Sequence, residues 1–70
     1  MTQKEVGAKI KAARIKRGLT QREFAEAIGY DSPTCDSTIR CIESGKTHPP
    51  YIRLRRMSEV LGISVYDMIP

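Results

Sequence analysis

Apolar residues recur along much of the chain at three- and four-residue spacing, which is the period of an α-helix that buries one face. Val6 and Ile10 open this pattern, and it predicts a first helix from about Gln3 to Arg17. Gly18 follows directly, and glycine often ends a helix because it adopts a left-handed backbone without strain. The sequence therefore begins with one amphipathic helix and a clear stop.

A second helix is bounded by chemistry at both ends. Thr20 and Glu23 have the three-residue spacing of a capping box, in which each side chain accepts a hydrogen bond from the other residue's backbone N–H. Phe24 and Ile28 supply an apolar face, and Gly29 is the expected stop. These signals predict a short helix between Thr20 and Gly29.

A third helix is predicted around Ile39 and Ile42, which give it an apolar edge. The pair Ser44-Gly45 ends it. Its other side carries small or polar residues, namely Asp36, Ser37, Arg40 and Cys41.

Two more helices follow a loop over residues 45–50 that is rich in Gly and Pro. The fourth is predicted from Tyr51 to Leu61, before Gly62. Ser64 and Asp67 have the spacing of another capping box and predict a last helical turn or two. Since no segment alternates like a strand, the fold class is predicted to be all-α with five helices.

The apolar positions of these helices are numerous enough to close one core. Its predicted members are Val6, Ile10, Leu19, Phe24, Ile28, Ile39, Ile42, Leu54, Met57, Leu61 and Ile63. A chain of 70 residues suits a single domain, residues 1–70. A domain this small buries only about 60% of its unfolded surface, so we expect modest stability that a dimer partner would raise.

Three motifs occur in order: Gly18-Leu19-Thr20-Gln21, Ala25-Glu26-Ala27-Ile28-Gly29 and Ile39-Arg40-Cys41-Ile42-Glu43-Ser44-Gly45-Lys46. With Pro49, Leu54, Met57 and Leu61-Gly62-Ile63-Ser64, this set resembles the Cro and repressor (Xre-like) family of phage and bacterial helix-turn-helix proteins. The likeness runs from Val6 to Ile69, and its specificity lies in the order of the motifs. It implies a compact, lambda-repressor-like DNA-binding domain with its helix-turn-helix at the second and third helices.

The segment from Tyr30 to Cys35 departs from the family pattern, because the connection here is longer by about four residues, roughly one helical turn. Two interpretations stay open. Ser32 as N-cap with Pro33 at the first helical position would lengthen the third helix. Asp36 as N-cap would instead leave a longer loop, which is the interpretation we favour.

Contacts that position the protein on DNA are expected at the start of the second helix and in the segment that follows the third. Gln21 starts the second helix, where its side chain and free backbone amides can bind a phosphate oxygen, and the resemblance gives the matching Gln this role. The resemblance also places phosphate contacts in the segment from Ser44 to Tyr51. The predicted phosphate contacts are Thr20, Gln21, Ser44, Lys46 and Tyr51.

The resemblance further implies a structural ion pair between Arg14 and Glu43, each of which falls on or beside the apolar face of its helix. A partly buried pair of this kind fixes orientation more than it adds stability. The alternative for Arg14 is one more solvated base on the first helix.

Base contacts are expected from the exposed side of the third helix. Arg40 is the strongest candidate, to guanine or to phosphate, while Ser37 can donate or accept and Cys41 can meet a thymine methyl group. Asp36 can accept from a cytosine amino group, although a role as N-cap explains it equally well. The inserted Thr34 and Cys35 are further candidates.

The charge balance favours a polyanionic partner, with twelve Lys and Arg against eight Asp and Glu and a net charge of +4. Arg53, Arg55 and Arg56 form the densest basic cluster. Such runs are usually solvated surface. The sharper alternative is that this cluster attracts flanking DNA or an acidic partner protein.

Other function classes find little support. Cys35 and Cys41 form no disulfide framework, which suggests a reduced, cytoplasmic setting, and His48 is the only imidazole, so no metal site is expected. No apolar run is long enough to span a membrane. We expect no catalytic site, because no nucleophile with a base and no phosphate-binding loop occurs, and we expect no cofactor or small-molecule ligand.

The sequence thus predicts a DNA-binding transcription regulator, a Cro-like repressor that acts as a homodimer on double-stranded DNA. Apolar residues of the last turn are candidate dimer contacts or a cover for the core: Val65, Tyr66, Met68 and Ile69. The alternative function is a protein-interaction or antitoxin-like regulatory module that binds its partner through the inserted segment and the arginine cluster.

Overall fold

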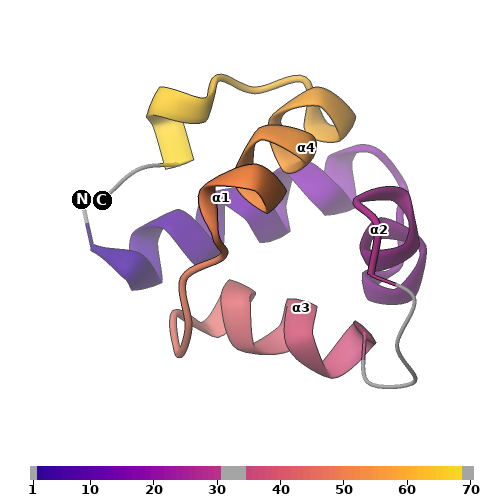
Figure 1. Cartoon of the computed structure of the whole chain (residues 1–70), viewed down its shortest axis with the longest axis horizontal. Helices are drawn as coiled ribbons and strands as arrows, with labels where there is room; N and C mark the ends of the chain where they lie inside the picture. The colour runs from indigo at the N-terminus through magenta and orange to yellow at the C-terminus, as the bar shows by residue number, and fades with distance from the viewer. Residues whose placement is uncertain (1, 31–34, 69–70) are drawn as a thin grey trace.

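The computed structural model describes residues 2–30 and 35–68, with the backbone alone for residues 35 and 36. Four α-helices occur there: α1 (Gln3–Lys16), α2 (Gln21–Ala27), α3 (Cys35–Ser44) and α4 (Tyr51–Leu61). A short 3₁₀-helix, η1 (Val65–Met68), follows them. In these residues no β-strand is present, so the predicted all-α class is confirmed. Helix α1 crosses the middle of the molecule, with α3 on one side and α4 and η1 on the other (Figure 1).

The helix starts follow the capping chemistry of the sequence. At α2, Thr20 Oγ1 accepts from the N–H of Glu23 at 3.0 Å, and the Glu23 carboxylate accepts from the N–H of Thr20 at 2.9 Å. The predicted capping box is therefore confirmed. The start of α1 has the same arrangement, between Thr2 and Glu5. Each box satisfies backbone donors that a helix start otherwise leaves unpaired.

The ends of α1, α2 and α3 share one backbone motif built on glycine. After α3, the N–H of Lys46 bonds to the carbonyl of Cys41 at 3.0 Å and that of Gly45 to Ile42 at 3.1 Å. These are the two bonds of a Schellman motif, and Gly45 has the positive φ, 83°, that the motif requires. The motif fixes the direction in which the chain leaves α3, and so the place of Lys46.

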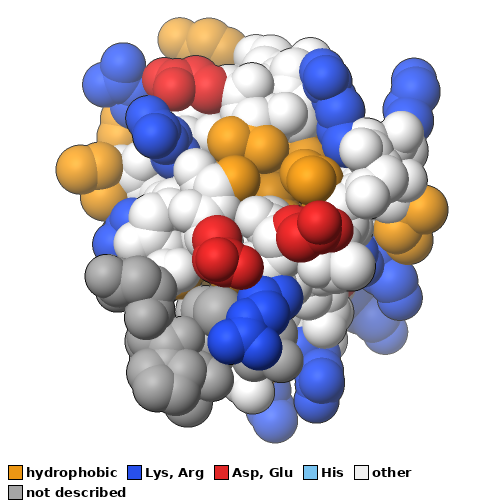
Figure 2. All heavy atoms as spheres, turned by 90° about the vertical axis from the view of Figure 1, so that its right-hand side faces the viewer, with side chains coloured by type: hydrophobic (Ala, Val, Ile, Leu, Met, Phe, Trp, Pro, Cys, Tyr) orange, Lys and Arg blue, Asp and Glu red, His pale blue; other side chains and the backbone are white. Residues whose placement is uncertain are grey.

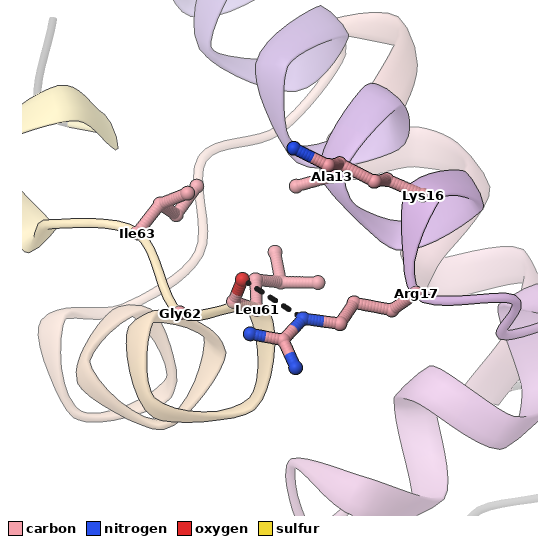
Figure 3. A pocket seen from close by; sticks show the side chains of 6 residues that line it. All are labelled: Ala13, Lys16, Arg17, Leu61, Gly62 and Ile63. Atoms are coloured by element: carbon pink, nitrogen blue, oxygen red, sulfur yellow. Dashed lines mark hydrogen bonds between the residues drawn. The ribbon is translucent and has the colours of Figure 1, made fainter.

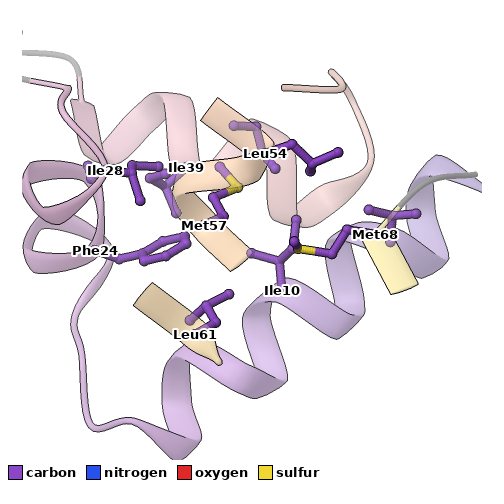
Figure 4. Packing of buried hydrophobic residues seen from close by; sticks show 11 residues of the cluster. Ile10, Phe24, Ile28, Ile39, Leu54, Met57, Leu61 and Met68 are labelled. Atoms are coloured by element: carbon purple, nitrogen blue, oxygen red, sulfur yellow. The ribbon is translucent and has the colours of Figure 1, made fainter. Parts of the chain in front are cut away.

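The core draws on every helix and on η1. Figure 4 shows side chains from α1, α2, α3, α4 and η1 pointing toward one another. Its buried members are Val6, Ile10, Phe24, Ala25, Ile28, Ile39, Ile42, Leu54, Met57, Leu61 and Met68. Nine of the predicted core residues are among these, and Leu19 and Ile63 pack half-buried at the edge. Because Ile39 and Ile42 lie in this core, α3 is fixed against the rest of the molecule.

Helices α1 and α3 also approach closely at Gly7, which is buried. A Cβ atom at this position would lie 2.5 Å from the carbonyl oxygen of Glu43 and closer still to that of Ile42. Backbone atoms cannot yield as the end of a flexible side chain does. The absence of a side chain at Gly7 therefore sets the distance between the two helices.

The predicted fifth helix is wrong in type, because η1 is a four-residue 3₁₀-helix. The Ser64 hydroxyl accepts from the N–H of Tyr66 at 3.2 Å, while the N–H of Asp67 bonds to the Ser64 carbonyl. This tighter turn replaces the predicted capping box. Met68 is fully buried, so it covers the core, whereas the Tyr66 side chain is 83% exposed. Val65 packs half-buried against the core, and Ile69 lies outside the described residues.

The predicted start of the third helix, with Asp36 as its N-cap, is also wrong. The described part of α3 begins at Cys35, so Asp36 lies within the helix rather than at its N-cap. An acidic residue is favourable in the first turn as well as at the cap, because both places lie near the positive end of the helix dipole. The sequence signal is the same in both cases. The alternative start at Ser32 and Pro33 falls on residues 31–34, outside the described part.

Candidate nucleic-acid interface

Helix α3 has one buried side and one exposed side. Ile39, Ile42 and Glu43 face the interior, whereas Ser37, Arg40 and Ser44 are exposed and Cys41 is half-buried. Residues 37, 40, 41 and 44 have helical spacing and share the outer surface. The helix lies at one edge of the molecule, with no other helix beyond it in Figure 1. The residues predicted to read bases are therefore displayed together, apart from Asp36, whose side chain is outside the description.

Arg14 and Glu43 join the inner side of α3 to α1. Nε of Arg14 donates to Oε2 of Glu43 at 2.6 Å, and Nη2 to Oε1 at 3.3 Å. The two side chains are only 10% and 4% exposed. Nη1 of Arg14 also donates to the carbonyl oxygen of Leu19 at 2.7 Å, in the connection between α1 and α2. One guanidinium thus links α1, the start of the helix-turn-helix and α3.

Gln21 belongs to the same network. Its Nε2 donates to Oε1 of Glu43 at 3.2 Å, and the residue is half-buried at the first position of α2. Sequence reasoning assigned Gln21 to a phosphate and did not find this bond. One amide N–H is used by the carboxylate, which leaves the second N–H of the group as a donor. Glu43 therefore fixes the direction of the amide that is predicted to meet DNA.

The other predicted phosphate contacts come from the start of α2, the end of α3 with the loop after it, and the start of α4. Thr20 is exposed beside Gln21, with its hydroxyl oxygen accepting from Glu23. Ser44 is the last residue of α3, and its hydroxyl donates to the carbonyl of Cys41 at 3.0 Å. Lys46 is exposed directly after the Schellman motif. Tyr51, the first residue of α4, is 63% exposed.

Positive charge also surrounds this region. Arg22 in α2, Arg40 in α3 and Lys46 in the following loop are exposed. Lys4 lies beside the end of α3, since a Cβ at Gly45 would lie 2.6 Å from its Cα. Figure 2 looks onto the α2 end of the molecule, and Lys and Arg side chains lie in its lower half, the side where Figure 1 places α3, and also near its upper edge. The acidic side chains of this face lie in its middle and near its top.

The arginine cluster of α4 is divided in the structure. Nη1 of Arg53 donates to the carbonyl oxygen of Ile28 at 2.8 Å, and its guanidinium lies 4.5 Å from the centre of the Tyr30 ring. Arg56 is exposed and lies 3.8 Å from Glu59, an i,i+3 pair on the surface of α4. The interpretation as solvated surface is therefore wrong for Arg53, which is bound to the end of α2. The alternative, attraction of flanking DNA or an acidic partner protein, stays a prediction.

A cavity of about 290 Å³ lies between the C-terminal ends of α1 and α4, away from α3. It is lined by Ala13, Lys16, Arg17, Leu61, Gly62 and Ile63 (Figure 3). Nε of Arg17 donates to the carbonyl oxygen of Leu61 at 3.3 Å, so this arginine, like Arg53, holds the end of a helix. No signal in the sequence had indicated either arginine as a backbone ligand.

The described residues contain no group of three or more His, Cys, Asp or Glu placed to hold a metal ion. None of the helices described combines the length and apolar character needed to cross a membrane.

The sequence model of one protein family, described as helix-turn-helix, matches residues 10–68. The chain therefore belongs to this family, the Cro and repressor (Xre-like) type that the sequence motifs resemble. Its members are DNA-binding transcription regulators and are generally not enzymes. No solved structure matches the chain.

Proposed function

We propose that the protein is a sequence-specific repressor of the Cro type, which places α3 in the major groove of an operator and thereby excludes polymerase. The observation that carries the proposal is the division of α3 into a buried side, held by Ile39, Ile42 and Glu43, and an outer side of polar residues. The major groove is about 12 Å wide and admits an α-helix.

Base contacts in this proposal come from the outer side of α3. Arg40 is exposed at its middle and supplies two parallel N–H donors for guanine, or one for a phosphate. Ser37 and Cys41 share its face and take the adjacent bases. Asp36, in the first turn, accepts from a cytosine amino group.

Phosphate contacts in this proposal lie on both sides of the groove. Thr20 and Gln21 bind one strand from the start of α2, where Glu43 orients the Gln21 amide. Ser44, Lys46 and Tyr51 bind the other strand from the end of α3 to the start of α4. Contacts of this kind set the register of the helix and carry no sequence information themselves.

The proposal includes a homodimer, with residues 1–70 as one DNA-binding unit. Two recognition helices then meet successive major grooves about 34 Å apart. Among the candidate dimer contacts that the structure describes, Val65, Tyr66 and Met68, Tyr66 is the one that is largely exposed, at 83%. Its ring is therefore available to a second copy.

The experiment that tests this function is selection of binding sites from randomised duplex DNA by the purified chain, followed by sequencing of the retained pool. An inverted repeat is the expected result. A pool held weakly, without enrichment and with steep salt sensitivity, would contradict the proposal and favour the alternative of a protein-interaction or antitoxin-like module.

A matched pair of variants sharpens the test. Arg40→Ala removes the main base contact, whereas Arg55→Ala removes the same charge from an exposed position on α4. We expect Arg40→Ala to weaken binding to the selected site by about 5- to 150-fold, the range of one good base contact. Arg55→Ala should leave the affinity within about twofold of the parent protein.

A further inference from the structure

Arg53 reaches from α4 to the end of α2 and makes two contacts there. Nη1 donates to the carbonyl oxygen of Ile28 at 2.8 Å, and the guanidinium lies over the Tyr30 ring at 4.5 Å from its centre. The side chain is half-buried. A hydrogen bond from a charged donor and a cation–π contact both gain strength where water is partly excluded.

The end of α2 is shaped to receive this side chain. Its Schellman motif pairs the N–H groups of Gly29 and Tyr30 with the carbonyls of Glu26 and Ala25, at 3.1 and 2.9 Å. The carbonyl of Ile28 takes no part in that motif, and Arg53 is its partner.

Gly29 leaves the room that the guanidinium fills. A Cβ atom on Gly29 would lie 2.5 Å from Nη1 of Arg53, and the φ angle of Gly29 is 96°. The end of α2 and the arginine are therefore fitted to each other.

The contacts of Arg53 lie where the chain leaves α2 on its way to α3. Tyr30 begins the segment that joins α2 to α3, the two helices of the helix-turn-helix. Arg53 adds a restraint from a third helix, α4, at the point where the connection leaves α2.

We infer that Arg53 is a positioning residue for the helix-turn-helix, which holds the end of α2 to α4 and thereby sharpens base discrimination without contacting DNA. The inference rests on the proposed function for its effect on DNA. The clamp itself is a property of the free protein. The two parts are therefore measured separately.

The free protein is tested by amide hydrogen exchange. Arg53→Met removes the donor and the charge but keeps much of the apolar stem, and Arg55→Met is the matched control on the exposed side of α4. We expect the amides of Gly29 and Tyr30 to exchange on the order of tenfold faster in Arg53→Met and unchanged in Arg55→Met. Unchanged exchange at these two amides in Arg53→Met would overturn the clamp.

The effect on DNA is tested with the same variants on the selected operator and on a scrambled duplex, over a series of salt concentrations. Arg53→Met should lower operator affinity by about tenfold more than scrambled affinity, with the same salt slope as Arg55→Met. Equal losses on both duplexes with a smaller slope would show a phosphate contact and overturn the positioning role. Equal affinity to the parent protein on both would overturn it as well.

Two controls separate the possible failures. Arg53→Lys keeps the positive charge and an N–H donor group, so it should recover part of the base discrimination that Arg53→Met loses. If Arg53 only stabilised the fold, the two variants would discriminate equally well at an assay temperature at which all variants are folded. A parent protein that selects no operator would overturn the proposed function and the effect on DNA, while the exchange data would still decide whether the clamp exists.

Discussion

Among the described residues, three arginines donate hydrogen bonds to backbone carbonyl oxygens. Arg14 donates to Leu19, Arg17 to Leu61, and Arg53 to Ile28. Arginine suits this use because its planar group presents several donors at fixed angles and stays charged. Net charge therefore overstates what the protein offers to DNA, since these guanidiniums are partly committed to holding helices together.

Arg14 and Glu43 give the sharpest residue-scale prediction. Arg14→Met or Glu43→Met alone leaves one buried charge without its partner, which should reduce the free energy of unfolding by about 3–5 kcal/mol. The double variant should lose clearly less than the two single losses combined, because neither charge remains. Urea denaturation measures all four proteins. Additive losses would contradict the view of the pair as one buried unit.

At the scale of helices, the contact between α1 and α3 sets how far the outer side of α3 stands from the body. Gly7 is buried where the two backbones meet, and the carbonyl oxygens of Ile42 and Glu43 occupy the space of a side chain. The network of Arg14, Glu43 and Gln21 lies along the same junction. Orientation of α3 thus depends on close packing at one residue and on hydrogen bonds at three others.

Gly7→Ala should lower the free energy of unfolding, although glycine-to-alanine substitution inside a helix usually raises it. Alanine in a helix interior is about 1 kcal/mol more favourable than glycine, yet here the added methyl group meets backbone and should cost about 1–3 kcal/mol. Ala12→Gly, at an exposed position of α1, is the control and should cost about 1 kcal/mol through propensity alone. Thermal unfolding compares them, and a stabilised Gly7→Ala protein would refute the close approach.

Helix boundaries were predictable where a residue type is favoured at only one position of a helix. The capping box at Thr20 and Glu23 and the glycines after α1 and α2 each specify a helix end, and the structure has them there. Asp36 misled because an acid is favoured at a cap and in a first turn alike. The type of the last helix was predicted wrongly because a serine such as Ser64 can begin either an α-helix or a 3₁₀-helix.

The site was predictable only where its residues carry a family pattern. Arg14 and Glu43 were paired through the resemblance, and the structure contains the pair. Arg53 looked like part of a surface run because Arg55 and Arg56 adjoin it, and its partner Ile28 lies 25 residues away. Local sequence carries no signal for a contact to a distant backbone carbonyl.

For the whole molecule, α3 lies on one side of α1 and α4 lies on the other (Figure 1). Exposed cations include a set near α3, with Arg40 and Lys46, and a set on α4, with Arg55. Only the first set adjoins the surface proposed to bind DNA.

The salt dependence of operator binding should separate the two sets of cations. Lys46→Met removes a proposed phosphate contact and should reduce the slope of log affinity against log salt by about one. Arg55→Met removes the same charge far from α3 and should leave the slope unchanged. Equal changes in both variants would mean that the protein's overall field, rather than specific contacts, governs binding.

The proposed dimer predicts how the spacing of the operator matters. Five additional base pairs between the half-sites turn one of them by about half a helical repeat, so a rigid dimer can no longer reach both. Affinity should then fall to that of a single half-site. Affinity unchanged by the insertion would show that each copy binds by itself.

The central claim, that α3 lies in the major groove, is tested most directly by methylation interference on the selected operator. Guanine N7 lies in the major groove and adenine N3 in the minor groove. We predict that methylation of guanine N7 blocks binding at two clusters about one helical turn apart, and that Arg40→Ala loses this sensitivity at one guanine in each cluster. Interference from adenine N3 alone, or none at any base, would contradict the account.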